Sequence, residues 1–284
     1  MGTINLIATA AFGLESVVAN ELKNLGYNNL KIENGKVSFA ADEKAIARCN
    51  LWLRSAERLL LKVGEFEARS FEELFENTRA LPWQDWIPAQ GQFPVEGKSI
   101  NSKLFSVSDC QAIVKKAVVE KLKQTYPCRW FSETGPRYRI EVSLLKDVAT
   151  LTIDTSGAGL HKRGYRKLSA AAPLKETLAA AIIMISRWKP DRALIDPFCG
   201  SGTIPIEAGL IGRNIAPGLN RSFDAENWAA LPARIWSEAR NETRDLIDHE
   251  QPLGIMGFDI DKEVISLARY HVKQCGLQNG ISLQ

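Results

Sequence analysis

The chain has 284 residues, of which 45% are hydrophobic, a length and composition typical of about two globular domains with substantial cores. No apolar stretch approaches the roughly 18 residues of a membrane span, and the N-terminal segment lacks both a basic leader and a cleavage pattern, so we expect a cytoplasmic protein. Five cysteines and three histidines without paired spacing argue against a metal site and a disulfide framework, and the net charge of +3 decides nothing about partners.

The first 66 residues predict a small α+β unit. Apolar residues alternate in three stretches, which indicates strands, and recur at helical spacing in two others. The elements alternate as strand, helix, strand, helix and strand over residues 6–12, 13–27, 35–40, 41–56 and 57–66. We therefore expect an N-terminal unit at residues 1–66.

A second unit is predicted over residues 67–166, where a short helix and a strand come first. Its main feature is an amphipathic helix over residues 108–126, with apolar residues on one face and Lys115 and Lys116 on the other. Residues 138–155 then alternate as the two strands of a hairpin.

The middle of the chain is basic. Between Lys98 and Lys167, fourteen basic residues outnumber six acidic ones, a net charge of about +8 that favours nucleic acid without separating RNA from DNA. The segment HKRGYR is the sharper candidate, because its cations and tyrosine can contact phosphates and stack on a base. The candidate RNA-binding residues are Lys115, Lys116, His161, Lys162, Arg163, Tyr165 and Arg166. A solvated helix face and a polar linker are the alternative explanations.

From Pro173 onward the pattern is that of a doubly wound parallel sheet. A nearly all-apolar and therefore buried helix is predicted over residues 174–188. Strands are then predicted at residues 193–198, 255–261 and 281–284, and helices at residues 203–212 and 262–276. The residues between Gly212 and Gly254 form an insertion with a helix of its own, whose purpose the sequence does not indicate.

The segment LIDPFCGSGT joins the first strand of this part to a helix through a glycine-rich loop. Gly200 and Gly202 let the backbone approach a ligand closely. The loop lacks the Lys-Ser or Lys-Thr pair of an ATP site and the third glycine of a nicotinamide site. Asp196 and Asp259 suit a ligand with an ammonium group and a ribose diol but no phosphate, which is S-adenosylmethionine (SAM). A turn cap at Asp196 and a helix cap at Asp259 are the alternative.

The loop DPFCGSGT is similar to the SAM loop of amino-methyltransferases, which modify nitrogens of bases. HKRGYR and the following APLKETLAAAII resemble one bacterial group within them, the THUMP-domain RNA methyltransferases related to the large-subunit (23S) rRNA guanine-N2 methyltransferase, often labelled N6-adenine-specific DNA methylases. The resemblance implies a ferredoxin-like N-terminal unit, a THUMP RNA-binding domain over residues 67–166, and a Rossmann-type class I methyltransferase domain over residues 167–284 that is incomplete in this chain.

The resemblance also implies which residues hold SAM. The methionine end would be lined by Asp196, Cys199, Gly200, Gly202 and Thr203, with Ser201 in the same loop. Asp259 would hold the ribose, Ile260 would pack on the adenine, and Thr177 with its neighbours at the head of the preceding helix would close the other side. We expect Cys199 to pack rather than to act as a nucleophile, because the nucleophilic cysteine of cytosine-C5 methyltransferases lies outside the SAM loop.

Members of this group carry an Asn-Pro-Pro-Tyr type motif that holds the target nitrogen and stacks on the flipped base, and this sequence does not contain it. We therefore expect the chain alone to be inactive, with no catalytic residue of its own and with its first parallel strand as an unprotected edge. The leading function is methyl transfer from SAM to guanine N2 of 23S rRNA without a metal. The alternatives are adenine-N6 methylation of DNA and a non-catalytic RNA-binding assembly factor.

Overall fold

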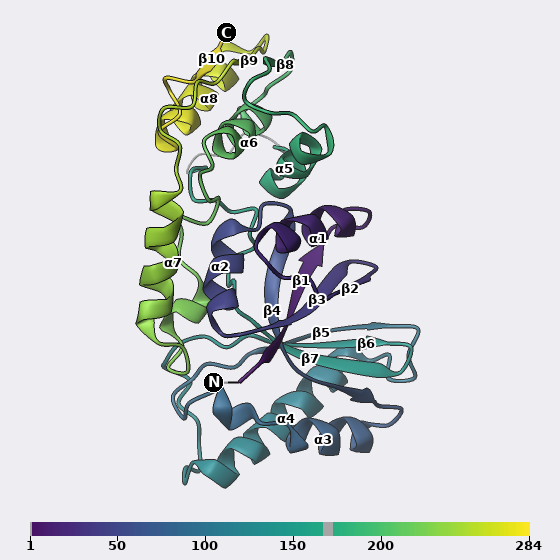
Figure 1. Ribbon diagram of the computed structural model, residues 1–284. Coiled ribbons are helices and arrows are strands. Elements are labelled where there is room, and N and C mark those ends of the chain that lie inside the picture. Colours follow the sequence, from purple (N-terminus) through teal and green to yellow (C-terminus); the bar gives the residue numbers. More distant parts are fainter. Residues whose placement is uncertain (1, 167–172) are drawn as a thin grey trace.

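The computed structural model describes residues 2–166 and 173–284, and its first six main elements form the N-terminal α+β unit (Figure 1). The strands and helices of this unit are β1 (Ile4–Ala10), α1 (Glu15–Asn24), β2 (Leu30–Glu33), β3 (Lys36–Ala41), α2 (Lys44–Trp52) and β4 (Ala56–Glu67). The strand β2 was not predicted from the sequence. It pairs antiparallel with β3, and Lys31 and Ile32 are exposed, so it lacks the apolar alternation of a buried strand.

The second predicted unit also contains the expected elements. They are α3 (Phe71–Ala80), β5 (Val95–Ile100), α4 (Val107–Thr125), β6 (Ile140–Leu145) and β7 (Val148–Asp154). The short 3-10 helix η1 (Trp83–Asp85), between α3 and β5, was not predicted. The predicted hairpin is present, since β6 pairs antiparallel with β7 and its two turn residues, Lys146 and Asp147, have φ values of 51° and 64°. The helix α3 begins where the Ser70 side chain accepts a hydrogen bond from the amide of Glu73.

The two predicted units share one continuous sheet. Within the described residues it has seven strands in the order β2-β3-β1-β4-β7-β6-β5. The long strand β4 joins the halves, because it pairs antiparallel with β1 on one side and with β7 on the other. We call the part of the chain that carries this sheet, residues 4–154, the front unit. The boundary predicted after residue 66 thus falls at the end of a strand that both halves use.

One face of this sheet carries the core of the front unit. Leu6, Leu61, Ile153 and Ile140 pair across four adjacent strands, so their side chains lie on the same face. All four are buried in a single hydrophobic cluster that also contains residues from helices α1 to α4. In Figure 1, α1 and α2 lie beside the upper half of the sheet and α3 and α4 beside the lower half. Both halves of the front unit are therefore one packed body.

The methyltransferase part has the predicted strand and helix order. Its elements are α5 (Glu176–Ile185), β8 (Leu194–Asp196), α6 (Thr203–Gly212), β9 (Ile255–Gly257), α8 (Lys262–Gln274) and β10 (Ile281–Leu283). In the described residues the three strands are parallel in the order β10-β9-β8, which confirms the doubly wound pattern. The predicted burial of α5 holds for one of its faces, which includes Ala179, Ala180 and Ile183, whereas Leu178, Ile182 and Ile185 on the other face are more than a third exposed.

The insertion (residues 213–253) contains η2 (Asp224–Asn227) and α7 (Ala233–Asp245), so the predicted helix is present. Figure 1 shows α7 running alongside α2 of the front unit. Within residues 2–166 and 173–284, no helix combines the length and apolarity that crossing a bilayer requires. Residue 167, where the third predicted domain begins, lies outside the described residues.

Candidate cofactor site and nucleic-acid interface

The glycine loop lies between β8 and α6. Cys199 donates its backbone N–H to the carbonyl of Phe258, which attaches the loop to the segment after β9, at 2.8 Å. Gly200 and Gly202 have φ values of +54° and +84°, a left-handed conformation that favours glycine. A Cβ at Gly200 would meet nothing within 4 Å, whereas one at Gly202 would lie 3.2 Å from the Cβ of Ala268 in α8. Gly202 therefore permits close helix packing, and Gly200 leaves open space in front of the backbone.

Two carboxylates lie at the ends of the adjacent strands β8 and β9. Asp259 accepts hydrogen bonds from the amides of Gly200 and Asp261, both at 3.0 Å, so it holds the loop while its remaining lone pairs stay available. Asp196 accepts a hydrogen bond from the amide of Phe198 at 3.1 Å. Burial raises the pKa of Asp196, and the nearby charge of Asp259 raises it further, against the lowering effect of the Phe198 amide.

The loop and both carboxylates border one cavity of about 380 Å³. Six of the predicted cofactor residues line it, namely Asp196, Cys199, Gly200, Ser201, Thr203 and Asp259. The lining also includes Pro173, Leu174, Phe198, Ile204, Asp261 and Val264, which the sequence did not single out. Leu174 and Val264 could have been found as apolar residues next to helix starts. Among these described lining residues there are three acids and no lysine or arginine, so the cavity favours a cationic ligand over a phosphate.

Three predicted cofactor residues do not line this cavity, namely Gly202, which packs against α8, Thr177 and Ile260. Thr177 is buried and donates its hydroxyl to Glu57 of the front unit at 3.0 Å, so the prediction that it closes the cofactor site is not supported. Its expected position is taken by Pro173 and Leu174, three residues or more earlier in the chain. Ile260 follows Asp259 directly and is fully exposed, so it is free to cover a ligand there. Its adenine contact stays a prediction.

Arg166 contacts the cofactor loop rather than open solvent. Its guanidinium donates to the Thr203 hydroxyl at 2.6 Å and forms an ion pair with Glu176 at 3.1 Å. Thr203 begins α6 and Glu176 begins α5, so one arginine ties both helix starts together beside the cavity. The side chain is 14% exposed, which leaves little of it for RNA. The two partners of Arg166, the Thr203 hydroxyl and the Glu176 carboxylate, lie outside HKRGYR, so this segment alone could not reveal them.

Burial of Arg163 and Tyr165 contradicts direct RNA contact by these two residues. Arg163 is 4% exposed and forms an ion pair with the fully buried Glu207 of α6 at 3.3 Å. Tyr165 is 5% exposed and packs near the ring of His271. His161 is half-buried, and its Nδ1 lies 3.9 Å from Glu57, while burial lowers its pKa. Glu57, the partner of His161, lies in the front unit, and Glu207, the partner of Arg163, lies in the methyltransferase part. The segment HKRGYR therefore joins these two parts of the protein.

Of the two candidate lysines of α4, one is paired within the protein and the other is exposed. Lys115 donates to Glu133 at 2.5 Å and to the carbonyl of Phe93 at 3.0 Å, and its Nζ lies 3.6 Å from the Phe93 ring centroid. The ammonium group of Lys115 is therefore already paired within the protein and is not free to bind a phosphate. Lys116 is exposed on the helix, and Lys162 is exposed in the segment that follows β7. Both therefore stay candidates for phosphate contact.

An exposed tryptophan that the sequence did not single out lies in the loop between α4 and β6. Trp130 is 85% exposed and follows the exposed Arg129. The loop is anchored on its other side, because Phe131 packs edge-on against Phe93 at 5.7 Å and Glu133 accepts a hydrogen bond from the Phe93 amide. An anchored aromatic next to a cation is suited to stacking on an unpaired base.

A loop of this geometry, with acids after two adjacent parallel strands and no cation lining the described cavity, defines the fold of a class I methyltransferase. Comparison with family models agrees. Residues 163–284 match the RMKL-like methyltransferase domain, residues 5–60 the RlmL ferredoxin-like domain, and residues 68–154 the THUMP domain.

Full-length relatives match almost the whole chain. "Putative RNA methyltransferase YpsC" of Bacillus subtilis (strain 168) is 52% identical over 279 residues, which are 98% of this chain and 72% of the relative. The crystal structure of a predicted N6-adenine-specific DNA methylase from Listeria monocytogenes is 54% identical with a TM-score of 0.97, over 100% of this chain and 75% of that one. The crystal structure of "SMU.472, a putative methyltransferase complexed with SAH" is 46% identical with a TM-score of 0.95, over 100% of this chain and 75% of that one. The chain belongs to the family of THUMP-domain, SAM-dependent RNA methyltransferases.

Proposed function

We propose that this methyltransferase transfers a methyl group from SAM to guanine N2 of 23S rRNA, which would place it in the cytoplasm. The observation that carries the proposal is the acidic cavity at the glycine loop, joined to a front unit with a THUMP domain. The name of the B. subtilis relative supports RNA as the substrate class, and the SAH complex of SMU.472 supports the cofactor.

The residues of the cavity fit SAM. Asp259 is held by two backbone amides, so its free lone pairs are oriented to accept the hydroxyls of a ribose diol. Asp196 offers a carboxylate to the ammonium group of the methionine end, and Gly200 leaves room for the ligand to lie against the backbone. Leu174 and Val264 supply apolar wall.

Bound SAM would supply an electrophilic methyl group for an in-line displacement by the base nitrogen. The contribution of this chain is to orient the donor and to limit the access of water. Arg166 keeps the starts of α5 and α6 at a fixed separation, so the loop keeps its shape before the ligand arrives. A preformed site loses less entropy on binding than a flexible one.

The function is tested first by calorimetry with SAM and SAH, and then by mass spectrometry of 23S rRNA from a strain that lacks the gene. We expect SAM binding and the loss of one N2-methylguanine. An unchanged guanine modification pattern would contradict the proposed target. Loss of N6-methyladenine from DNA in that strain would instead favour the DNA alternative, and normal nucleic acids with intact SAM binding would favour an assembly factor.

The raised pKa of Asp196 predicts how SAM affinity depends on pH. The ionised carboxylate attracts the ammonium group, so affinity is complete above the pKa of Asp196 and falls as the pH drops through it. Because burial and Asp259 raise this pKa, the fall begins at a higher pH than for an ordinary aspartate, whose pKa is about 3.9. Calorimetric titrations between about pH 4 and pH 8 measure this profile.

The matched variants for the pH profile are Asp196→Asn and Asp191→Asn. The first should bind SAM more weakly at neutral pH and should lose the acidic fall that Asp196 causes. The second changes an exposed aspartate shortly before β8 and should leave the profile of the wild type. If Asp196→Asn kept the wild-type profile, Asp196 would not contact the ammonium group.

A second prediction concerns the exposed Trp130. Its replacement by alanine should lower the affinity for single-stranded rRNA fragments by roughly tenfold, because stacking on one base contributes about 1–3 kcal/mol. The control is Phe12→Ala, which removes an equally exposed ring, 85% in both cases, from the ferredoxin-like half of the front unit. Fluorescence anisotropy of labelled RNA measures the difference. Equal affinities of the two variants would contradict a stacking role for Trp130.

A further inference from the structure

The insertion leaves the methyltransferase part and packs against the front unit. Its apolar side chains belong to the core of the front unit, as the cluster membership of Phe223, Ala225, Trp228, Ile235 and Trp236 shows. Its two ends meet again, because the Asp248 amide donates to the carbonyl of Arg213 at 2.9 Å. The insertion therefore leaves the methyltransferase part after α6 and returns to nearly the same place before β9.

Specific contacts fix the insertion on both halves of the front unit. Trp228 stacks on Tyr138 with ring centroids 4.9 Å apart, and its indole N–H donates to the carbonyl of Arg137 at 2.9 Å. Along α7, Glu242 forms an ion pair with Arg48 of α2 at 3.0 Å. These contacts reach the THUMP half and the ferredoxin-like half, so the insertion spans the continuous sheet.

The insertion also holds the connector, residues 155–166, that leads from the front unit to the cofactor loop. The Arg221 guanidinium donates to four of its carbonyls. These belong to Ser156, Ala158, Gly159 and Lys162, at distances of 3.3, 2.6, 2.7 and 3.0 Å. Neutral carbonyls of an irregular segment thus share one half-buried cation, whose pKa desolvation lowers to about 10, so it remains charged at neutral pH.

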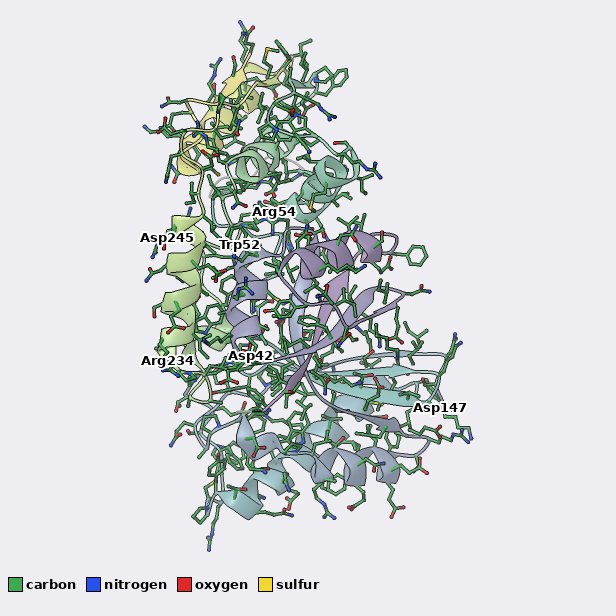
Figure 2. The ribbon with its side chains drawn as sticks, viewed as in Figure 1. Asp42, Trp52, Arg54, Asp147, Arg234 and Asp245 are labelled. Atoms are coloured by element: carbon green, nitrogen blue, oxygen red, sulfur yellow. The ribbon has the colours of Figure 1, made fainter. Side chains whose placement is uncertain are left out.

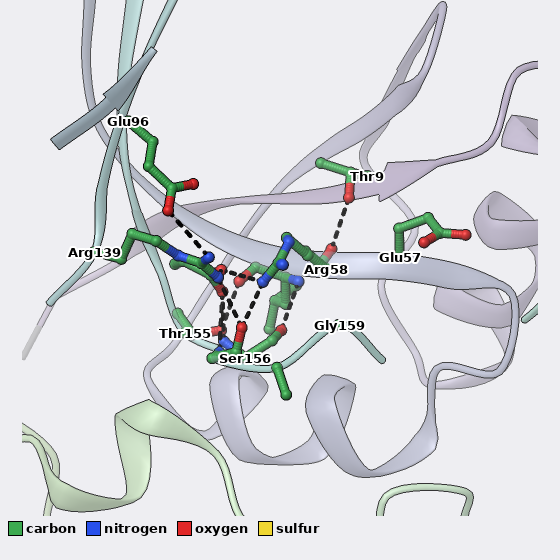
Figure 3. A network of polar contacts seen from close by, with 12 residues as sticks. Thr9, Glu57, Arg58, Glu96, Arg139, Thr155, Ser156 and Gly159 are labelled. Atoms are coloured by element: carbon green, nitrogen blue, oxygen red, sulfur yellow. Dashed lines mark hydrogen bonds and ion pairs between the residues drawn. The ribbon is translucent and has the colours of Figure 1, made fainter. Parts of the chain in front are cut away.

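Arg221 is itself held in place. Arg240 of α7 donates to the carbonyls of Leu219 and Arg221, both at 2.7 Å, and pairs with Glu226 at 2.5 Å. The start of the connector is held by the front unit as well, because Arg58 and Arg139 both contact Asp154 and the carbonyl of Gly157. Figure 3 shows these two arginines beside Thr155 and Ser156 at the start of the connector.

The far end of the connector is attached to the cofactor site. Arg163 pairs with Glu207 of α6 and donates to the backbone carbonyl of Arg54, while Arg166 donates to Thr203 at the loop. Figure 2 shows Arg54 where the front unit meets the methyltransferase part. Arg163, which directly follows the Lys162 carbonyl held by Arg221, therefore contacts the helix that begins at the SAM loop.

We propose that the insertion is a brace and that Arg221 is a positioning residue, which together set where the front unit holds RNA relative to the methyl donor. This proposal rests on the proposed function, since it concerns which nucleotide of a bound RNA reaches the cavity. RNA held by a front unit in one orientation presents one nucleotide to the cofactor. If the connector is loosened, the front unit takes up several orientations, so several nucleotides reach the cofactor and each does so for a smaller fraction of the time.

The test compares Arg221→Met with Arg234→Met in the whole protein. Arg234 lies exposed at one end of α7 (Figure 2), and its guanidinium has no hydrogen bond or ion pair within the described residues. Hydrogen exchange of the backbone amides of residues 155–165 should become about tenfold faster in Arg221→Met and stay unchanged in Arg234→Met. Unchanged exchange in Arg221→Met would overturn the proposal.

A second readout separates positioning from folding. Arg221→Met should keep its SAM affinity within roughly twofold, while methylation of rRNA should spread to neighbouring nucleotides or its kcat should fall. Arg221→Lys retains the charge with fewer fixed donors and should lie between the wild type and Arg221→Met, which keeps the test informative if Arg221→Met does not fold. If methylation stays at one nucleotide at full rate despite faster exchange, Arg221 has no positioning role.

The two proposals can fail separately. Faster connector exchange in Arg221→Met, together with a wild-type protein that leaves rRNA unmodified, would retain the brace and contradict the proposed substrate. A wild-type protein that methylates rRNA, together with unchanged connector exchange in Arg221→Met, would retain the function and contradict the brace.

Discussion

Replacing Asp259 with alanine is expected to weaken SAM binding by about 100-fold or more. The carboxylate holds the amides of Gly200 and Asp261 and also faces the cavity that six predicted cofactor residues line. Two charge-assisted hydrogen bonds to a ribose diol contribute roughly 3 kcal/mol or more together, and each 1.4 kcal/mol corresponds to about a tenfold change in Kd. Calorimetry with SAM and with SAH should show the same loss, because both ligands carry the ribose.

Two further variants make the Asp259 result specific. The amides of Gly200 and Asp261 bond to different oxygens of Asp259, so Asp259→Asn keeps an acceptor for only one of them and lacks the charge. Its loss of affinity should still be smaller than that of Asp259→Ala, which keeps neither acceptor. Asp191→Ala removes an exposed aspartate outside the cavity lining and should bind SAM like the wild type. A Kd of Asp259→Ala within roughly fivefold of the wild type would exclude this cavity as the cofactor site.

The cofactor loop could be predicted because its determinants are contiguous in the sequence. A strand, a glycine-rich turn and a helix follow each other within DPFCGSGT, and the second acid comes directly after the next strand. Gly200 and Gly202 have the left-handed backbone that their residue type suggested. Thr177 was misplaced because its partner is Glu57, more than a hundred residues away, and no local pattern reports that contact.

The misassignment of HKRGYR has the same physical origin. Clustered cations between glycines are typical of an exposed nucleic-acid contact, yet a buried carboxylate can reverse that prediction. Glu207 lies within α6 and Glu176 is the first residue of α5, two helices whose sequences are mostly apolar, and these carboxylates pair with Arg163 and Arg166. Of the three lysine and arginine residues of HKRGYR, namely Lys162, Arg163 and Arg166, only Lys162 is exposed.

The continuous sheet also escaped prediction. The sequence of each half is that of a complete α+β unit. The alternation of apolar and polar residues along a strand indicates which face is buried, but it does not indicate which other strand it pairs with. The pairing of β4 with β7 joins residues such as Leu61 and Ile153, whose separation in the sequence exceeds the span of any local pattern. The helix of the insertion was predicted by its periodicity, but its packing on α2 depends on Arg48 and other residues near the beginning of the chain.

Removing Arg163 alone is expected to lower the free energy of unfolding by about 3–5 kcal/mol, since an uncompensated carboxylate would remain buried. Glu207 is fully buried, and the Arg163 side chain is 3% exposed. Arg163 also donates to the carbonyls of Leu160 and Arg54, so Arg163→Met leaves further acceptors without their donor. Urea unfolding followed by tryptophan fluorescence measures the change, and the exposed Arg244→Met should alter stability by less than about 0.5 kcal/mol.

The double variant Arg163→Met, Glu207→Leu separates the charge from the packing. Apolar residues of similar volume can replace a buried ion pair at little cost, so the double variant should regain most of the stability that Arg163→Met loses. A double variant no more stable than Arg163→Met would assign the loss to the carbonyls of Leu160 and Arg54 instead. Because Arg163 lies between the connector and α6, a stable double variant would also show that joining the two parts of the protein requires filled volume there rather than charge.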